Sequence, residues 1–291
     1  MFKTHSNFLL PFLFITLYGS GFVATKYGLI NASPLAFLLI RFLIAFIILV
    51  FLSYVLKVSW PKNMKEIFHI SVAGTLTVAV FSIGVYLSID LGVSPSLNAL
   101  IIALQPALVT VLAIIFLREK ISPRHWIGLF IGFIGVSCVV LSKFEINSSQ
   151  MQGIFMSVFA LLGLSFGNLY QKKYCSNMNL FSGGVIQTLA SSLLVLPLML
   201  VFEEVRLDWN MDLVYAILYM SIAVSIGALS VLYILIQNKD VSKVSSMFYL
   251  IPVCAVVMSY IFFDENVDLS VIIGIFTVLI GITMINKKDK K

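Results

Sequence analysis

Charged residues divide this chain of 291 residues into long segments that contain none. Nine such segments lack Asp, Glu, Lys and Arg: residues 4–25, 67–89, 91–117, 125–142, 146–171, 174–202, 213–238, 244–263 and 269–286. A tenth, residues 34–56, is interrupted only by Arg41. A helix needs about 20 apolar residues to cross a bilayer, whereas barrel strands are about 10 residues long and alternate in hydrophobicity. The spacing of charge therefore predicts an all-α polytopic membrane protein with ten transmembrane helices.

The composition argues against several other classes of protein. Hydrophobic residues make up 60% of the chain, compared with about 45–50% in soluble domains. The cysteines Cys138, Cys175 and Cys254 form no CxxC pair, and the histidines have no HExxH spacing. A phosphate-binding loop of the G-x-x-x-x-G-K-[ST] type is also missing from the sequence. We therefore expect neither an enzyme nor a metal ion or other cofactor.

The basic residues predict the orientation of the chain. With ten crossings and the N-terminus inside, most of the 19 Lys and Arg residues fall in inside segments, and only Lys143 and Arg206 fall in outside loops. Short loops rich in Lys and Arg stay on the cytoplasmic side of a membrane. We therefore expect a cytoplasmic (inner) membrane protein with both termini inside. The net charge of +6 then reflects topology, and we expect no nucleic acid as a partner.

The sequence repeats itself at an offset of 146 residues, because residues 104–135 can be laid over residues 250–281 without a gap. The overlay pairs Pro106 with Pro252, Glu119 with Glu265, Gly128 with Gly274 and Gly135 with Gly281. Such self-similarity indicates a duplicated unit, here residues 1–145 and 146–291. Each unit has five predicted crossings, and this odd number makes the second unit enter the membrane from the opposite side. The sequence therefore predicts two inverted five-helix repeats.

Three groups of residues resemble the EamA family of the drug/metabolite transporter superfamily. They are the segment Tyr18-Gly19-Ser20-Gly21-Phe22-Val23-Ala24, Pro34 followed by Arg41, and the pattern Pro-x12-Glu-x8-Gly-x6-Gly in both halves. Tyr18 stands where many members have Trp. The resemblance covers essentially the whole chain, and it implies a ten-helix carrier with a central cavity that often exports amino acids or related metabolites.

We therefore expect a secondary transporter that moves a small polar metabolite, an amino acid or related compound, outward by alternating access. The alternative is a flippase or exchanger for an anionic lipid-linked or nucleotide-type metabolite. The expected partners are the small-molecule substrate and the lipid bilayer, with the chain acting as a monomer or a homodimer. The spacing Gly128-x3-Gly132 predicts close packing of helices, with dimerisation as the second interpretation.

Arg41 is the charged residue that lies deepest in a predicted helix. It follows Pro34 by seven residues, which places it about 10 Å below the membrane boundary at 1.5 Å per residue. A charge at that depth faces protein or water. Arg41 either contacts an anionic group of the substrate or forms a structural ion pair with Asp90. Lys26 would be a second cation on the same side, or it would extend to the headgroups.

Two prolines follow polar residues at mid-depth in equivalent helices. Gln105 precedes Pro106 near the expected midplane, and Tyr249 lies three residues before Pro252 in the second half. A proline inside a helix frees a carbonyl one turn earlier and bends the helix, and transporters place substrate groups at such points. We expect Gln105 and Tyr249 to face a shared cavity and the prolines to act as hinges, with packing as the alternative.

Other polar residues complete the candidate site. Tyr18, Tyr86 and Asn168 lie inside predicted helices, where they either line a cavity or join helices through hydrogen bonds. Glu119 and Glu265 follow equivalent helices at opposite faces of the membrane. Their symmetric placement suggests matching gate or hinge contacts, while solvated charges at helix ends are the alternative.

Overall fold

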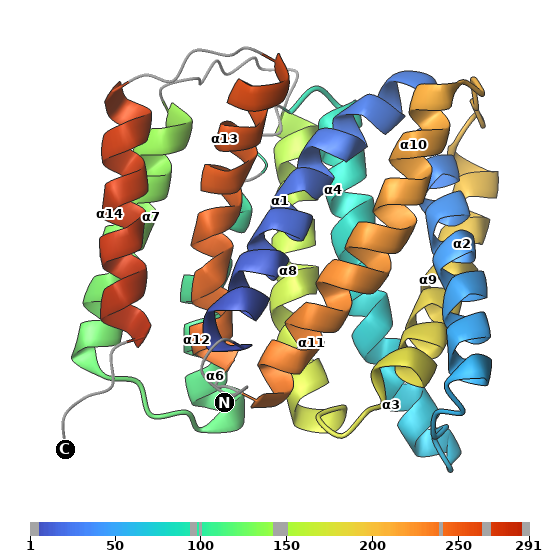
Figure 1. The fold of residues 1–291 in the computed structure, drawn as a ribbon, viewed down its shortest axis with the longest axis horizontal. Helices are drawn as coiled ribbons and strands as arrows, with labels where there is room; N and C mark the ends of the chain where they lie inside the picture. The colour runs from blue at the N-terminus through green and yellow to red at the C-terminus, as the bar shows by residue number, and fades with distance from the viewer. Residues whose placement is uncertain are drawn as a thin grey trace.

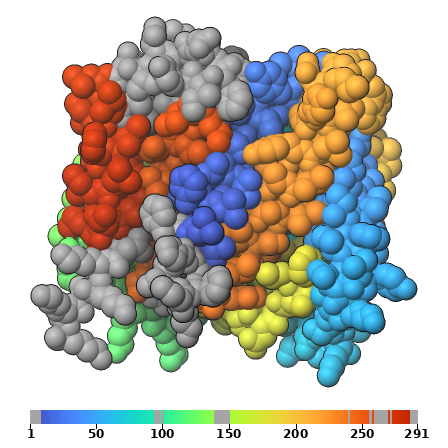
Figure 2. Space-filling view, viewed as in Figure 1, coloured from blue at the N-terminus to red at the C-terminus, as the bar shows by residue number. Residues whose placement is uncertain are grey.

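The protein is a bundle of helices in the computed structural model, which describes residues 6–93, 98, 101–141, 151–238, 241–263 and 269–286. Six helices are uninterrupted: α1 (Ser6–Asn31), α2 (Pro34–Val55), α7 (Pro123–Leu141), α8 (Met151–Tyr174), α9 (Leu180–Phe202) and α14 (Leu269–Asn286). The helices lie side by side, and α1 begins on the side of the bundle on which α14 ends (Figure 1). In the view of Figure 2, α14 forms one edge and α2 the opposite edge, with α1 between them.

The remaining helices are shorter pieces, most of them stacked end to end. The first composite rod contains α3 (Met64–Gly74), the π-helical segment η1 (Thr75–Val80) and α4 (Phe81–Asp90), and α6 (Gln105–Leu117) follows it. The second contains α10 (Met211–Tyr219), the π-helical segment η3 (Met220–Ala228) and α11 (Leu229–Asn238). The third contains α12 (Val241–Ser245), the 3₁₀ segment η4 (Ser246–Tyr249) and α13 (Leu250–Phe263). The two π-helical segments occupy equivalent places in the two halves of the sequence.

Among the described residues, six helical segments are long and apolar enough to cross a membrane: Leu9–Asn31, Pro34–Val55, Met64–Asp90, Met151–Tyr174, Leu180–Phe202 and Met211–Asn238. Three shorter apolar helices accompany them: Gln105–Leu117, Val241–Cys254 and Ile272–Ile285. The predicted all-α, multi-pass membrane architecture is therefore confirmed. The count of ten crossings stays a prediction.

The outer surface of the bundle is apolar, as α2 illustrates. Phe42 and Leu49 on its inner side are 0% and 3% exposed, whereas Ile47, Phe51 and Tyr54 on its outer side are 63%, 64% and 83% exposed. The alternation follows the period of an amphipathic helix, but both sides are apolar or aromatic. Soluble monomers seldom expose apolar surface on this scale, so lipid is the natural solvent of the outer side.

Two pairs of equivalent helices, α7 with α14 and α2 with α9, pack antiparallel. In the α7–α14 pair, Gly128 lies against Gly281, and Gly135 lies against Gly274. Residue numbers thus rise along one helix as they fall along the other, and the same holds for α2 and α9, where Ala36 contacts Glu203. The absence of side chains at the glycines lets the two backbones approach closely, which confirms the close packing predicted from the glycine spacing.

The two prolines lie in the first turns of α6 and α13, just after a change in the local helical structure. A turn at Ala103 and Leu104 precedes α6, so Pro106 lies in the first turn of α6. In the second half, η4 precedes α13, so Pro252 also lies in a first turn. Proline is tolerated there because N–H groups in the first turn have no partner within the helix. The equivalent helices of both halves are therefore interrupted at the same point.

Candidate functional site

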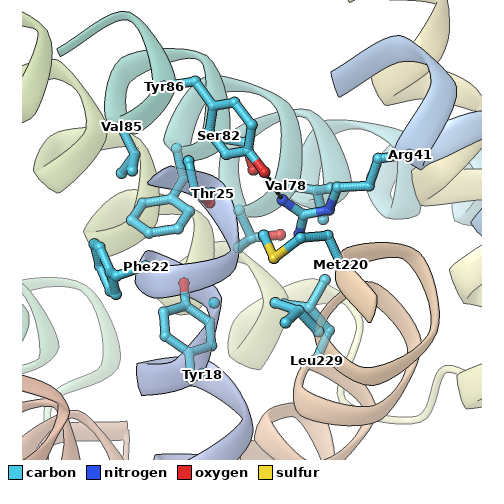
Figure 3. A pocket seen from close by; sticks show the side chains of 14 residues that line it. Tyr18, Phe22, Thr25, Arg41, Val78, Ser82, Val85, Tyr86, Met220 and Leu229 are labelled. Carbon is cyan, nitrogen blue, oxygen red and sulfur yellow. Dashed lines mark hydrogen bonds between the residues drawn. The ribbon is translucent and has the colours of Figure 1, made fainter. Parts of the chain in front are cut away.

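A small cavity lies where α1, α2 and the two π-helical segments meet. Figure 3 shows its lining, which comprises Tyr18, Gly21, Phe22, Thr25, Arg41, Thr77, Val78, Phe81, Ser82, Val85, Tyr86, Met220, Val224 and Leu229. The centre of a water-sized sphere can move through about 40 Å³ of it. Since one water needs about 10–15 Å³ by this measure, the cavity in this conformation has room for a few waters and none for a metabolite.

Arg41 supplies the charge of this cavity. Its side chain is 4% exposed, and its Nε donates to Ser225 Oγ at 2.7 Å while Nη1 donates to Tyr86 Oη at 3.1 Å. The guanidinium carbon also lies 6.0 Å from the centre of the Tyr86 ring. Within the described ranges, Arg41 forms no ion pair with a carboxylate. The buried cation is thus oriented by neutral groups that leave its charge uncompensated.

Contacts at the start of α2 fix the depth of Arg41. Pro34 opens the helix, and the Glu203 carboxylate from the end of α9 accepts hydrogen bonds from the N–H groups of Leu35 (2.9 Å) and Ala36 (3.0 Å). Burial raises the pKa of Glu203, and the nearby negative charge of Asp90 raises it further, while these hydrogen bonds act in the opposite direction. The second half of the chain therefore holds the helix that carries Arg41.

Lys26 and Asp90 do not join Arg41. Both are exposed, and neither is among the residues that line the cavity. Asp90 ends α4 and lies close enough to Glu203 to influence its pKa, which places it at the end of the bundle rather than beside the guanidinium. In this structure the ion pair between Arg41 and Asp90, one of the two interpretations of Arg41, is not formed.

Tyr18 and Tyr86 both line the cavity, as the sequence suggested. Tyr18 is 5% exposed, and its hydroxyl has no hydrogen-bond partner among the described residues. Its ring lies 5.2 Å from Phe14, 5.5 Å from Phe248 and 5.9 Å from Phe81, measured between ring centres. In Figure 3 the Tyr18 ring lies on the side of the cavity opposite Tyr86, and its contact with Phe248 joins α1 to η4.

Gln105, Tyr249 and Asn168 lie elsewhere in the core, since none of them lines this cavity. Tyr249 is fully buried and donates to the Leu129 carbonyl of α7 at 3.0 Å, so it packs against α7 instead of facing a cavity shared with Gln105. Gln105 is 0% exposed, and both polar atoms of its amide have no partner among the described residues. The same is true of the Asn168 side-chain oxygen.

Glu119 connects the two halves. Its carboxylate accepts a hydrogen bond from the Val241 N–H at 3.0 Å and another from Ser242 Oγ at 2.6 Å, so it caps the start of α12. A carboxylate is favourable there because the N-terminus of a helix carries partial positive charge. Its repeat mate Glu265 lies outside the described residues.

Sequence reasoning missed the hydrogen-bonding partners around the site. Ser225 accepts a hydrogen bond from Arg41, and Thr77, which also lines the cavity, has its Oγ1 2.9 Å from the Tyr233 hydroxyl. Both Ser225 and Thr77 belong to π-helical segments, which occur frequently at functional sites. A serine or threonine in an apolar helix does not by itself predict a site, because the direction in which its side chain points depends on the local helical register.

The described residues contain no group of three or more His, Cys, Asp or Glu side chains that could hold a metal ion. The chemistry available in the cavity is therefore that of one guanidinium, phenolic hydroxyls and aliphatic hydroxyls. Such groups bind and orient a polar or anionic molecule through hydrogen bonds and charge.

Comparison with known proteins shows similarity along the whole chain. The uncharacterized transporter YvbV of Bacillus subtilis is 28% identical over 99% of this chain and 93% of its own length. An uncharacterized transporter of Archaeoglobus fulgidus is 26% identical over 95% of this chain and 97% of its own. The uncharacterized inner membrane transporter YedA of Escherichia coli is 22% identical over 85% of this chain and 79% of its own.

One protein of known crystal structure has the same fold. It superposes with a TM-score of 0.79 at 16% sequence identity, and the match covers 97% of both chains.

The family model of the EamA-like transporter family matches the chain twice, over residues 6–141 and residues 151–287. Together the two matches span nearly all of the sequence. The relatives are transporters rather than enzymes, and the described helices have the length and apolar surface of membrane-spanning segments. This chain is a multi-pass membrane transporter that belongs to the EamA-like transporter family.

Proposed function

We propose that this protein moves a small polar metabolite with an anionic group, such as an amino acid, across the cytoplasmic membrane, and that Arg41 binds the anionic group. The observation that carries the proposal is a buried guanidinium that lines a cavity and has no carboxylate partner within the described ranges. Removing a cation from water costs several kcal/mol unless an opposite charge compensates it. A carboxylate of the substrate would supply that charge, and two guanidinium nitrogens bind it with defined geometry.

Transport by alternating access would open the closed cavity to each side in turn. Buried polar atoms of Tyr18, Gln105 and Asn168 have no hydrogen-bond partner within the described part of the chain, which supports such a change. A buried polar group without a partner costs about 1–3 kcal/mol, so a conformation that hydrates or pairs these groups is favoured by that amount. The breaks before Pro106 and Pro252 would let the half-helices move relative to the rest of the bundle. Export is the direction that the family resemblance implies.

We further propose ten crossings in two inverted repeats, with both termini in the cytoplasm. The antiparallel packing of equivalent helices and the excess of basic residues on one side support this topology. The name of the Escherichia coli relative supports the inner membrane. Reporter fusions after Lys65 and Lys173 should read cytoplasmic, and fusions after Ile146 and Asp208 should read external. Two or more reversed readings would refute the inverted topology.

Transport into proteoliposomes tests the binding role of Arg41. A panel of radiolabelled amino acids and nucleotide-type anions should first identify a substrate. A hydrogen bond to a charged group is worth about 1.5–3 kcal/mol, so Arg41→Gln should weaken apparent affinity roughly 10- to 100-fold. Arg41→Lys should restore only part of it, because the charge remains while the planar fork is lost.

Arg206→Gln is the matched control, since this arginine lies outside the cavity and forms its ion pair with Asp208. It should leave affinity for the substrate unchanged. A purely structural role for Arg41, through its hydrogen bonds to Ser225 and Tyr86, predicts a different pattern: Arg41→Gln would lower thermal stability, and affinity for the substrate would not change. That pattern would overturn the binding role.

A further inference from the structure

An apolar groove with a basic end runs along the outside of α8. It lies between α8, η1 and α6, and about 600 Å³ of it is open to the centre of a water-sized sphere. The apolar part of the groove is lined by Leu76, Phe116, Phe159, Leu162 and Phe166. Lys173 and Tyr174 lie at the basic end. From Phe159 to Tyr174 the helix rises about 22 Å, which exceeds the roughly 15 Å depth of one leaflet's hydrocarbon. The groove is therefore long enough for an acyl chain.

Aromatic residues surround Lys173 at the basic end of the groove. The His69 ring stacks on Tyr174 with the ring centres 4.6 Å apart, and its Nδ1 lies 2.7 Å from the Tyr170 hydroxyl. Lys173 Nζ lies 5.3 Å from the centre of the Tyr174 ring. Tyrosines gather at the level of lipid headgroups, where their rings meet both apolar chains and water. This end of the groove thus has the chemistry of the membrane interface.

The two neighbouring lysines at this end have different roles. Lys172 Nζ donates to the carbonyls of Ile236 (2.6 Å) and Gln237 (3.2 Å), so it stabilises the end of α11. Lys173 is exposed and forms no ion pair with any carboxylate in the described ranges. The charge of Lys173 is therefore available to a ligand.

A second, polar cavity adjoins the groove at Lys173 and Tyr174, which line both. About 470 Å³ of it is open to a water-sized sphere, and its other walls include Lys62 and Glu66. The Glu66 carboxylate already accepts hydrogen bonds from the Lys62 N–H and the Asn63 side-chain amide. The joined cavities thus offer an apolar slot, a cationic junction and a polar chamber, in the order of the parts of a phospholipid.

We propose that this composite groove binds an anionic phospholipid, with an acyl chain along α8 and the phosphate at Lys173. By the expected topology this lipid belongs to the cytoplasmic leaflet. The site is separate from the cavity at Arg41, so it does not depend on the proposed substrate. Lipid occupancy would brace α8 against η1, which carries part of the lining of that cavity.

Native mass spectrometry of the full-length protein in detergent tests the proposal with no need for transport. The protein is mixed with equal amounts of phosphatidylglycerol and phosphatidylcholine that carry the same acyl chains. Wild type should retain phosphatidylglycerol in preference, and Lys173→Gln should weaken its retention about fivefold, the usual effect of one lysine at a membrane surface. Retention of phosphatidylcholine should not change with this variant.

Lys65→Gln is the matched control, because Lys65 is exposed on α3 and lines neither cavity. It should behave as wild type. Leu162→Trp, which fills the apolar slot, should weaken retention of both lipids. Equal losses in Lys65→Gln and Lys173→Gln would show general attraction to a basic surface and would overturn the proposal, as would no loss in Lys173→Gln.

A fluorescence measurement on a protein that keeps Lys173 provides a second test. In a Phe166→Trp protein whose native Trp60, Trp126 and Trp209 are replaced by Phe, phosphatidylglycerol with brominated acyl chains should quench the added tryptophan more strongly than brominated phosphatidylcholine does. Equal quenching by the two lipids would mean that the groove holds ordinary boundary lipid, and it would refute the proposed selectivity.

Discussion

Removing the Glu119 carboxylate should loosen one contact between the two halves of the protein. Glu119 accepts two hydrogen bonds at the start of α12, one from Val241 and one from Ser242. Glu119 is partly exposed, so water would replace part of the hydrogen bonding that the substitution removes. The free-energy cost should therefore lie in the range found for loss of a helix cap, about 0.5–2 kcal/mol. We assume that these two hydrogen bonds form only when α6 and α12 are in contact. Glu119→Ala should then increase the fraction of molecules in which the two helices are apart about 2- to 30-fold.

The rate at which a buried cysteine reacts measures that population. Ser245 in α12 is 1% exposed, so a Ser245→Cys reporter, in a background without Cys138, Cys175 and Cys254, should react slowly with a water-soluble maleimide. Glu119→Ala should increase the rate by the same factor. Glu119→Gln should give a smaller increase, because its amide oxygen can still accept from Val241.

The control for this experiment is Glu66→Gln, which alters a carboxylate that, within the described ranges, accepts hydrogen bonds only from Lys62 and Asn63, at the start of its own helix, α3. It should leave the labelling rate unchanged. An unchanged rate in a folded Glu119→Ala protein would refute the role of Glu119 as a closing contact, and so would a loss of thermal stability without faster labelling.

Two further predictions concern stability. Because the folded-state pKa of Glu203 is raised, its ionisation opposes folding, and thermal stability in detergent should fall as pH rises from about 4.5 through the raised value. Glu203→Gln should remove that slope, and an unchanged pH profile would contradict the assignment. A Cβ at Gly281 would lie 2.6 Å from the backbone nitrogen of Gly132, so Gly281→Ala should destabilise the protein by about 1–3 kcal/mol. Gly227→Ala is its control, since the nearest atom is the flexible tip of Leu17 at 3.3 Å, and equal melting temperatures for the two variants would refute the packing argument.

The spacing of charge predicted the all-α, multi-pass architecture, because this pattern follows directly from the bilayer. A charge-free segment of about 20 residues leaves few alternatives to a spanning helix. Tyr18 and Tyr86 could be proposed to line a cavity because polar residues in such helices face the protein interior, whereas the expected grouping of Arg41 with Asp90 is not found.

The details of the site depend on interactions that the sequence pattern does not encode. Proline is compatible both with a kink inside a helix and with the first turn of a new helix. The residues around Pro106 and Pro252 therefore do not show which of the two occurs. Tyr249 was expected to face a cavity, but its hydroxyl is satisfied by the Leu129 carbonyl of a helix far along the chain. Ser225 could not be chosen among many serines without knowing the register of the π-helical segment that carries it.

The α7–α14 contact has the geometry of a symmetric dimer interface contained in one chain. Gly128 meets Gly281, the repeat mate of Gly135, while Gly135 meets Gly274, the repeat mate of Gly128. This reciprocity is the mark of an isologous, twofold contact. In a dimer of identical five-helix units, every side chain at the central cavity would be present twice. Fusion into one chain removes that constraint, so Arg41 can present a single guanidinium to the proposed substrate while its repeat mate, Gln187, is neutral and donates instead to the Gln171 side chain at 3.0 Å.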